Sequence, residues 1–100
     1  MANLSKHHWL QAEKSIGELL TKFPKHLDLE TIRFVKEYLT HREYEMAFEG
    51  LFIELIDAEI VLSEAEKERY FTLGQDLGLN IESVFDDGFW NAFSKFVNER

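Results

Sequence analysis

Residues 43–58, EYEMAFEGLFIELIDA, carry the densest apolar pattern in the chain and indicate its fold class most directly. Apolar side chains recur there at spacings of three and four residues, which places them on one face of an α-helix. That face consists of Tyr44, Ala47, Phe48, Leu51, Leu55 and Ala58, and Phe52 widens it. Met46 and Ile53 lie on the opposite side of the helical wheel. A helix that is apolar on more than one side is typical of the centre of a bundle, although an exposed docking patch would show the same pattern.

Two helices are predicted ahead of this segment. The first covers residues 6–22 and should end before Pro24, because proline disfavours the helical conformation of the residue that precedes it. Asp28 is a suitable N-cap for the second helix, which should fade near residues 40–41. The predicted inner faces are Trp9, Ala12, Ile16, Leu19, Leu20 and Phe23 in the first helix, and Leu29, Ile32, Val35, Tyr38 and Leu39 in the second.

Two more helices are predicted after it, beyond a short extended connection at residues 60–62. Ser63 and Glu66 have the spacing of a capping box, and Gly78 suits a left-handed helix end. Asp86 or Asp87 should cap the last helix. The predicted inner faces are Ala65, Tyr70, Leu73 and Leu77, and then Phe89, Ala92, Phe93 and Phe96 with Trp90 beside them. The expected fold is all-α, a compact bundle of about five helices with short loops, forming a single domain over residues 1–100.

The amino-acid composition limits the class of protein and the compartment in which it is expected. The chain has 100 residues, 45% of them hydrophobic and 30% charged, which is enough apolar surface for one folded domain and excludes disorder. It contains no cysteine, so it has neither disulfides nor thiolate zinc sites. No apolar run approaches the roughly 18 residues of a membrane-spanning helix. The opening MANLSKHHWLQAEK lacks the apolar core of a signal peptide. We therefore expect a cytoplasmic protein that does not enter the membrane.

Charge is distributed very unevenly along the chain. The total is −8, but residues 43–87 hold thirteen acidic residues against Lys67 and Arg69, a net of −11, while residues 1–42 carry a net of +2. A direct nucleic-acid binder would instead cluster lysine and arginine to neutralise phosphates. Two interpretations of the acidic segment stay open. It is either a solvated face that keeps the protein soluble or a docking surface for a basic partner.

Motifs for catalysis or metal binding are missing from the sequence. It has no nucleophile elbow, no phosphate-binding glycine loop and no H-E-x-x-H pair. His41 lies four residues from both Glu37 and Glu45, but it falls where one helix should end, and a helix-terminal histidine is the simpler interpretation. The pairs Glu45–Glu49 and Glu64–Glu68 are one helical turn apart, which fits a solvated acidic face or a partner contact. We therefore expect that the protein is not an enzyme and that it binds neither a cofactor nor a metal ion.

Three stretches resemble the MafI-type and CdiI-type immunity proteins of bacterial contact-dependent growth inhibition and related toxin systems. They are YLTHREYEMAFEGLFIELI, LSEAEKERYFTLGQDLGLN and ESVFDDGFWNAF, and the similarity covers roughly residues 15–96. The matching residues are Tyr38, Leu39, His41, Glu43, Tyr44, Ala47, Phe48 and Glu49, followed by Leu77, Gly78 and Leu79. The resemblance implies a cytoplasmic immunity protein, or antitoxin, that binds one cognate toxin domain, with 1:1 stoichiometry expected. Many such toxins are basic nucleases such as RNases, which an acidic surface would attract.

The predicted contact surface lies on the fourth helix and in the segment before the fifth. It combines acidic residues with two large amphipathic side chains, the types enriched at binding hot spots. The candidates are Glu64, Glu68, Tyr70, Asp76, Glu82, Asp86, Asp87 and Trp90. For Tyr70 and Trp90 a place in the core is the competing interpretation. The alternative function is an acidic helical adaptor or regulator that binds a basic or amphipathic partner in a groove beside the third helix.

Overall fold

The computed structural model describes residues 6–99, with the side chains of residues 9–98. Its elements are α1 (Lys6–Lys22), the short 3-10 helix η1 (Pro24–His26), α2 (Leu29–Thr40), α3 (Tyr44–Asp57), α4 (Glu64–Asp76) and α5 (Phe89–Glu99). No strand occurs within residues 6–99, so the all-α prediction is confirmed. None of the helices described combines the length and apolar content needed to cross a bilayer.

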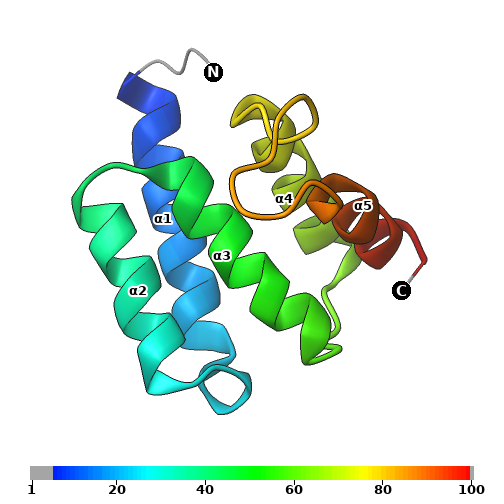
Figure 1. The fold of residues 1–100 in the computed structure, drawn as a ribbon, viewed down its shortest axis with the longest axis horizontal. Helices are drawn as coiled ribbons and strands as arrows, with labels where there is room; N and C mark the ends of the chain where they lie inside the picture. Colours follow the sequence, from blue (N-terminus) through cyan, green and yellow to red (C-terminus); the bar gives the residue numbers. More distant parts are fainter. Residues whose placement is uncertain (1–5, 100) are drawn as a thin grey trace.

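Helix α3 lies at the centre of the bundle. Helices α1 and α2 are on one side of it, and α4 and α5 are on the other (Figure 1). Its inner side chains are almost completely enclosed: Phe48, Leu51, Phe52 and Leu55 have no exposed surface. The ring of Phe93, from α5, lies 5.4 Å from that of Phe48 and 5.0 Å from that of Phe52. The apolar pattern of residues 43–58 therefore marks the core, as the sequence predicts.

The predicted helix ends are confirmed where the signal is local. Asp28 Oδ1 accepts a hydrogen bond of 2.7 Å from the N–H of Thr31 at the start of α2. Ser63 and Glu66 form both hydrogen bonds of the capping box of α4, at 3.2 and 2.8 Å. Gly78 has a φ of 79°, the left-handed conformation expected after α4.

Helices α2 and α3 are each followed by a residue in the left-handed conformation that is not glycine. Arg42 after α2 has a φ of 58°, and Glu59 after α3 has a φ of 55°. The next N–H in each case bonds back to a carbonyl of the last turn, Glu43 to Tyr38 at 2.9 Å and Ile60 to Leu55 at 3.4 Å. This is the Schellman arrangement usually made by glycine, and the sequence gives no glycine signal for it at either position.

The predicted inner faces are wrong at four positions. Leu29 is 78% exposed and Trp9 is 39% exposed, and Ala65 and Ala92 are also exposed. All four lie in the first turn of their helices. Periodicity assigns a residue to a face, but for Leu29, Trp9 and Ala65 it does not say where along the helix the neighbouring element begins to cover that face. Ala92 follows the buried Phe89 in α5, so there the predicted inner face is too wide.

Candidate partner-binding surface

Glu49 is a fully buried carboxylate on α3, with no exposed surface. Its Oε1 accepts a hydrogen bond from the main-chain N–H of Val84 at 2.8 Å. Its Oε2 accepts two more, from Phe85 at 2.7 Å and Asp86 at 2.9 Å. The interpretation of Glu45 and Glu49 as one acidic surface pair is therefore wrong for Glu49, because the carboxylate points inward and serves as the acceptor for a loop.

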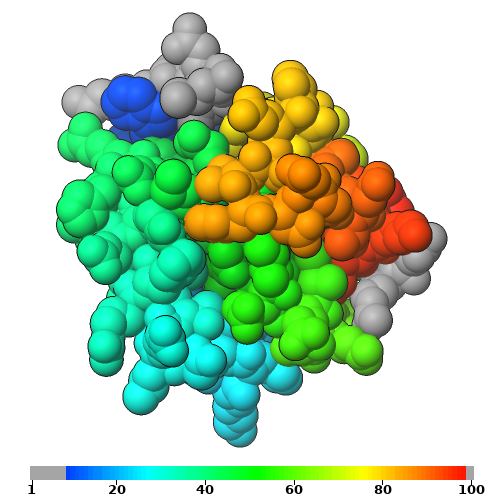
Figure 2. Space-filling model, in the orientation of Figure 1, coloured from blue at the N-terminus to red at the C-terminus, as the bar shows by residue number. Residues whose placement is uncertain are grey.

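That loop, residues 80–88, is called the anchored loop below. It runs beside α3 and in front of α4 before it enters α5 (Figure 1), and Figure 2 shows its yellow-to-orange atoms next to the green atoms of α3. At its end Asp86 Oδ1 accepts a hydrogen bond of 2.9 Å from the N–H of Gly88, so Asp86 organises the turn that leads into α5. Of the two aspartates predicted to cap α5, Asp86 is the one whose carboxylate makes such a bond. The donor, Gly88, directly precedes the helix.

The anchored loop places Phe85 beside two aromatic side chains of α2. The ring centroid of Phe85 lies 6.0 Å from that of Phe34 and 6.3 Å from that of Tyr38. Phe34 and Tyr38 make an edge contact at 4.6 Å. Phe34 keeps 39% and Phe85 46% of its surface exposed to solvent. These three residues are called the aromatic cluster.

A groove of about 330 Å³ lies on each side of Phe34. The first is lined by Asp28, Glu30, Thr31, Phe34, Gly50, Ile53, Glu54 and Phe85. The second is lined by Phe34, Glu37, Tyr38, His41 and Glu43. Together the linings contain five carboxylates and no lysine or arginine. The aromatic cluster and these two grooves are called the acidic–aromatic surface.

Gly50 shapes the first groove. A Cβ atom at this position would lie 2.9 Å from Cε1 of Phe34 and 3.7 Å from Cε2 of Phe85. The ring of Phe34 would have to move to admit it. The absence of a side chain at Gly50 therefore lets both rings lie close to the backbone of α3.

The predicted acidic residues are all exposed but form two sets. Glu82, Asp86 and Asp87 lie on the anchored loop, whereas Glu64, Glu68 and Asp76 lie on α4. Glu68 and Asp76 line a groove of about 530 Å³ between α1 and α4, and this groove also contains Lys14 and Arg69. Glu64 pairs with Lys67 at 3.1 Å. The α4 set therefore lies among basic side chains, unlike the carboxylates around Phe34.

The prediction that Tyr70 contributes to a contact surface is wrong. Its side chain is only 2% exposed, and its hydroxyl donates a hydrogen bond of 2.9 Å to the carbonyl of Ser15 on α1. Burial raises the pKa of Tyr70 to about 12. Trp90 is partly buried, with its ring 5.3 Å from both Phe71 and Phe93 and against Gly74. Tyr70 packs between α4, α3 and α1, and Trp90 packs between α4 and α5, so neither is a freely exposed hot spot.

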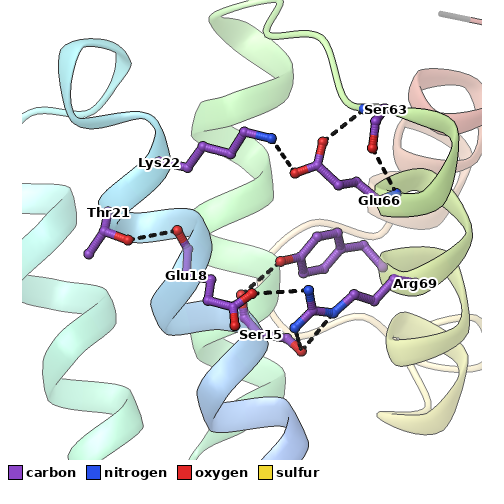
Figure 3. A network of polar contacts seen from close by, with 8 residues as sticks. Ser15, Glu18, Thr21, Lys22, Ser63, Glu66 and Arg69 are labelled. Carbon is purple, nitrogen blue, oxygen red and sulfur yellow. Dashed lines mark hydrogen bonds and ion pairs between the residues drawn. The ribbon is translucent and has the colours of Figure 1, made fainter.

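Figure 3 shows that α1 and α4 are joined by a polar network. Arg69 donates to the hydroxyl of Ser15 at 2.8 and 3.2 Å and pairs with Glu18 at 3.0 Å. Glu66 pairs with Lys22. Burial opposes ionisation of Glu66, but Lys22 and the hydrogen bonds from Ser63 outweigh it and lower the pKa. These partners already satisfy the polar groups, which fits a role in holding the helices together.

His41 lies at the end of α2, where its ring Nδ1 is 2.9 Å from the carbonyl oxygen of Glu37. Because a carbonyl can only accept, the ring nitrogen donates, as expected of a helix-terminal histidine. Within the described residues, no three histidine, aspartate or glutamate side chains are grouped so that they could hold a metal ion. The adjacent residues His7 and His8 lie outside the described side chains.

Sequence reasoning missed Glu49, Phe34 and Phe85 as determinants of this surface. One signal for Phe34 was present in the sequence: it is a large aromatic residue outside the inner face predicted for α2, where side chains are expected to be exposed. An exposed aromatic residue can mark an interaction site. Glu49 gave none, because its hydrogen-bond partners lie 35 to 37 residues away in the chain.

No family model, curated protein or solved structure matches the chain. The residues that carry the resemblance to immunity proteins are largely structural. Tyr44, Ala47, Phe48 and Glu49 are buried on α3, and Leu77 and Leu79 are buried on either side of Gly78. In this chain, these residues therefore pack the core and hold the anchored loop.

Proposed function

We propose that this chain is an immunity protein that binds and neutralises a basic bacterial toxin domain, such as an RNase, through the acidic–aromatic surface. One observation carries the proposal: two grooves around an exposed phenylalanine present five carboxylates and no lysine or arginine. The resemblance of residues 15–96 to MafI-type and CdiI-type proteins supplies the class of partner.

The chemistry suits that partner. A nuclease is basic where it binds phosphates, and a surface rich in carboxylates presents a similar field to it. Complementary charge accelerates encounter, up to about 10⁸–10⁹ M⁻¹s⁻¹ at low salt. Exposed aromatic side chains then exclude water at the contact and slow dissociation. Inhibition needs only that the toxin surface be covered, so no catalytic group is required of this chain.

The test uses the reading frame next to this gene. An immunity gene is expected directly downstream of the gene for its toxin, so the toxin domain encoded there should arrest growth when it is expressed alone. Co-expression of this chain should restore growth, and the purified proteins should form a 1:1 complex. An adjacent frame that encodes no toxin, or a toxin that stays fully active beside this chain, would contradict the proposal and favour the adaptor function.

A matched pair of variants connects the activity with the surface. Glu30→Lys with Glu54→Lys reverses two exposed carboxylates of the first groove, and Glu64→Lys with Glu68→Lys makes the same change on α4. The first pair should abolish protection and the second should retain most of it, because like charges across a contact are repulsive. Circular dichroism melts would show that both variants are folded.

A further inference from the structure

Building on this proposed function, we infer that Phe34 and Phe85 together form the anchor point of the interface and receive one apolar side chain from a lysine- or arginine-rich segment of the partner. The partner segment is a basic helix or loop. Its cations would meet Glu30 and Glu54 on one side of the anchor, and Glu37 and Glu43 on the other.

Exposure singles out these two rings. The chain has nine phenylalanines, all with described side chains, and among them only Phe34 and Phe85 are exposed, at 39% and 46%. They come from distant parts of the sequence and are nevertheless neighbours, with ring centroids 6.0 Å apart. Two solvated aromatic rings that adjoin each other beside a groove form the kind of continuous apolar patch that marks interaction sites.

The surrounding structure holds both rings in place before any partner arrives. The N–H of Phe85 itself donates to the buried carboxylate of Glu49 at 2.7 Å. Phe34 is fixed by its edge contact with Tyr38 at 4.6 Å and by the space left at Gly50. A surface ordered in advance loses little conformational entropy on binding, which favours affinity.

Charge then identifies the partner. The linings of the two grooves contain Asp28, Glu30, Glu37, Glu43 and Glu54. The exposed cations of α2, Arg33 and Lys36, line neither groove. An acidic or neutral apolar segment would bring no compensating charge to these carboxylates, whereas a basic amphipathic segment pairs with them as its apolar side chain is buried.

Alanine variants test the anchor. Phe34→Ala and Phe85→Ala should each weaken binding of the toxin domain from the adjacent gene at least about tenfold, measured by titration calorimetry. Ile81→Ala is the matched control, because Ile81 is 86% exposed on the same loop but lines neither groove, and it should change the dissociation constant less than about twofold. Thermal melts would verify that each variant is folded, and Phe34→Ser offers a second form of the truncation.

A peptide probe separates this inference from the proposed function. It is a synthetic amphipathic helix of about sixteen residues with lysines on one face and leucines on the other. Its binding to the ¹⁵N-labelled chain should shift the amide signals of Phe34, Gly50 and Phe85. If the toxin binds and both alanine variants bind it as tightly as the wild type, the inference is wrong and the function stands. If the toxin does not bind but the peptide shifts these signals, the function is wrong and the surface stands. If neither ligand binds, both are wrong.

Discussion

A carboxylate buried as completely as that of Glu49 is stable only if hydrogen-bond donors replace the water it has lost. Three main-chain N–H groups of the anchored loop do so, at 2.7 to 2.9 Å. Their own burial away from water would be unfavourable without an acceptor. The side chain and the loop are therefore interdependent, and a change in Glu49 should be felt at the surface of the loop.

Replacing Glu49 by glutamine tests this dependence. The amide nitrogen would face main-chain N–H donors, so at least one hydrogen bond would be lost and a donor left unpaired. The free energy of unfolding should fall by about 2–4 kcal/mol. Urea denaturation would measure the loss, and hydrogen exchange at residues 84–86 should quicken. Glu45→Gln, one turn away on the same helix and partly exposed, is the control. Equal stability of the two variants would contradict the role assigned to Glu49.

Because of Tyr70, the free energy of unfolding should depend on pH in the alkaline range. Its pKa is raised to about 12, whereas an unfolded tyrosine ionises near 10. Between these values the unfolded chain loses a proton that the folded chain keeps, so the contribution of Tyr70 is complete below pH 10 and is lost as the pH rises through 12.

Tyr70→Phe should remove that dependence. At pH 7 the variant should be about 1 kcal/mol less stable than the wild type, because the hydrogen bond to Ser15 is lost. The deficit should shrink and then reverse as the pH rises from 10 to 12, because phenylalanine has no proton to release. Denaturation at a series of pH values would measure this difference, and parallel curves for the two proteins would contradict it.

At the scale of elements, the local signals of the sequence were sufficient for the ends of helices. Asp28 and the Ser63–Glu66 pair bond to groups only three residues away. A left-handed Gly78 is likewise a local requirement. The Schellman ends at Arg42 and Glu59 could not be predicted in this way, because neither position holds the glycine that usually marks such an end.

Arg42 offers a direct measure of the strain at such an end. Its φ of 58° favours glycine, which has no Cβ to clash with the following carbonyl. Arg42→Gly should therefore be more stable than Arg42→Ala by about 0.5–1 kcal/mol, since both variants lack the arginine side chain and differ in the Cβ. Thermal unfolding would detect this as a difference of about 2–8 °C in Tm. An alanine variant as stable as the glycine variant would show that the helix end is relaxed.

At the scale of the whole molecule, the sequence predicted the bundle and its core but not the assembly of its surface. The aromatic cluster joins Phe34 of α2 to Phe85 of the anchored loop, and only the packing of α2 and the loop on α3 brings the two together. The charge count pointed to residues 43–87, whereas three of the five carboxylates around Phe34, namely Asp28, Glu30 and Glu37, come before that segment. The predicted carboxylates on α4 and on the loop fall into two separate sets. Contacts between distant segments carry no local signature, which is why this part of the site was missed.

The charge of the whole chain leads to a prediction about rates. Screening lengths fall from about 30 Å at 0.01 M salt to about 8 Å at 0.15 M. If the acidic–aromatic surface steers a basic partner, the association rate with the toxin domain should fall at least about tenfold over that range, while the dissociation rate changes much less. Stopped-flow fluorescence would separate the two rates. The Glu30→Lys, Glu54→Lys variant should show a weaker salt dependence, and a flat wild-type profile would rule out steering.

The way in which Glu49 holds the anchored loop also affects how the protein could change. The carboxylate accepts hydrogen bonds from main-chain N–H groups, which every residue except proline possesses. These bonds do not depend on the side chains of Val84, Phe85 and Asp86. Most side chains of this loop point into solvent. Apart from Asp86, whose carboxylate holds the turn into α5, substitutions along the loop would therefore alter the chemical character of the surface while preserving the path of the backbone. A single buried acid thus separates the shape of the loop from its composition, so that recognition of a new partner could be acquired without rebuilding the scaffold that presents it.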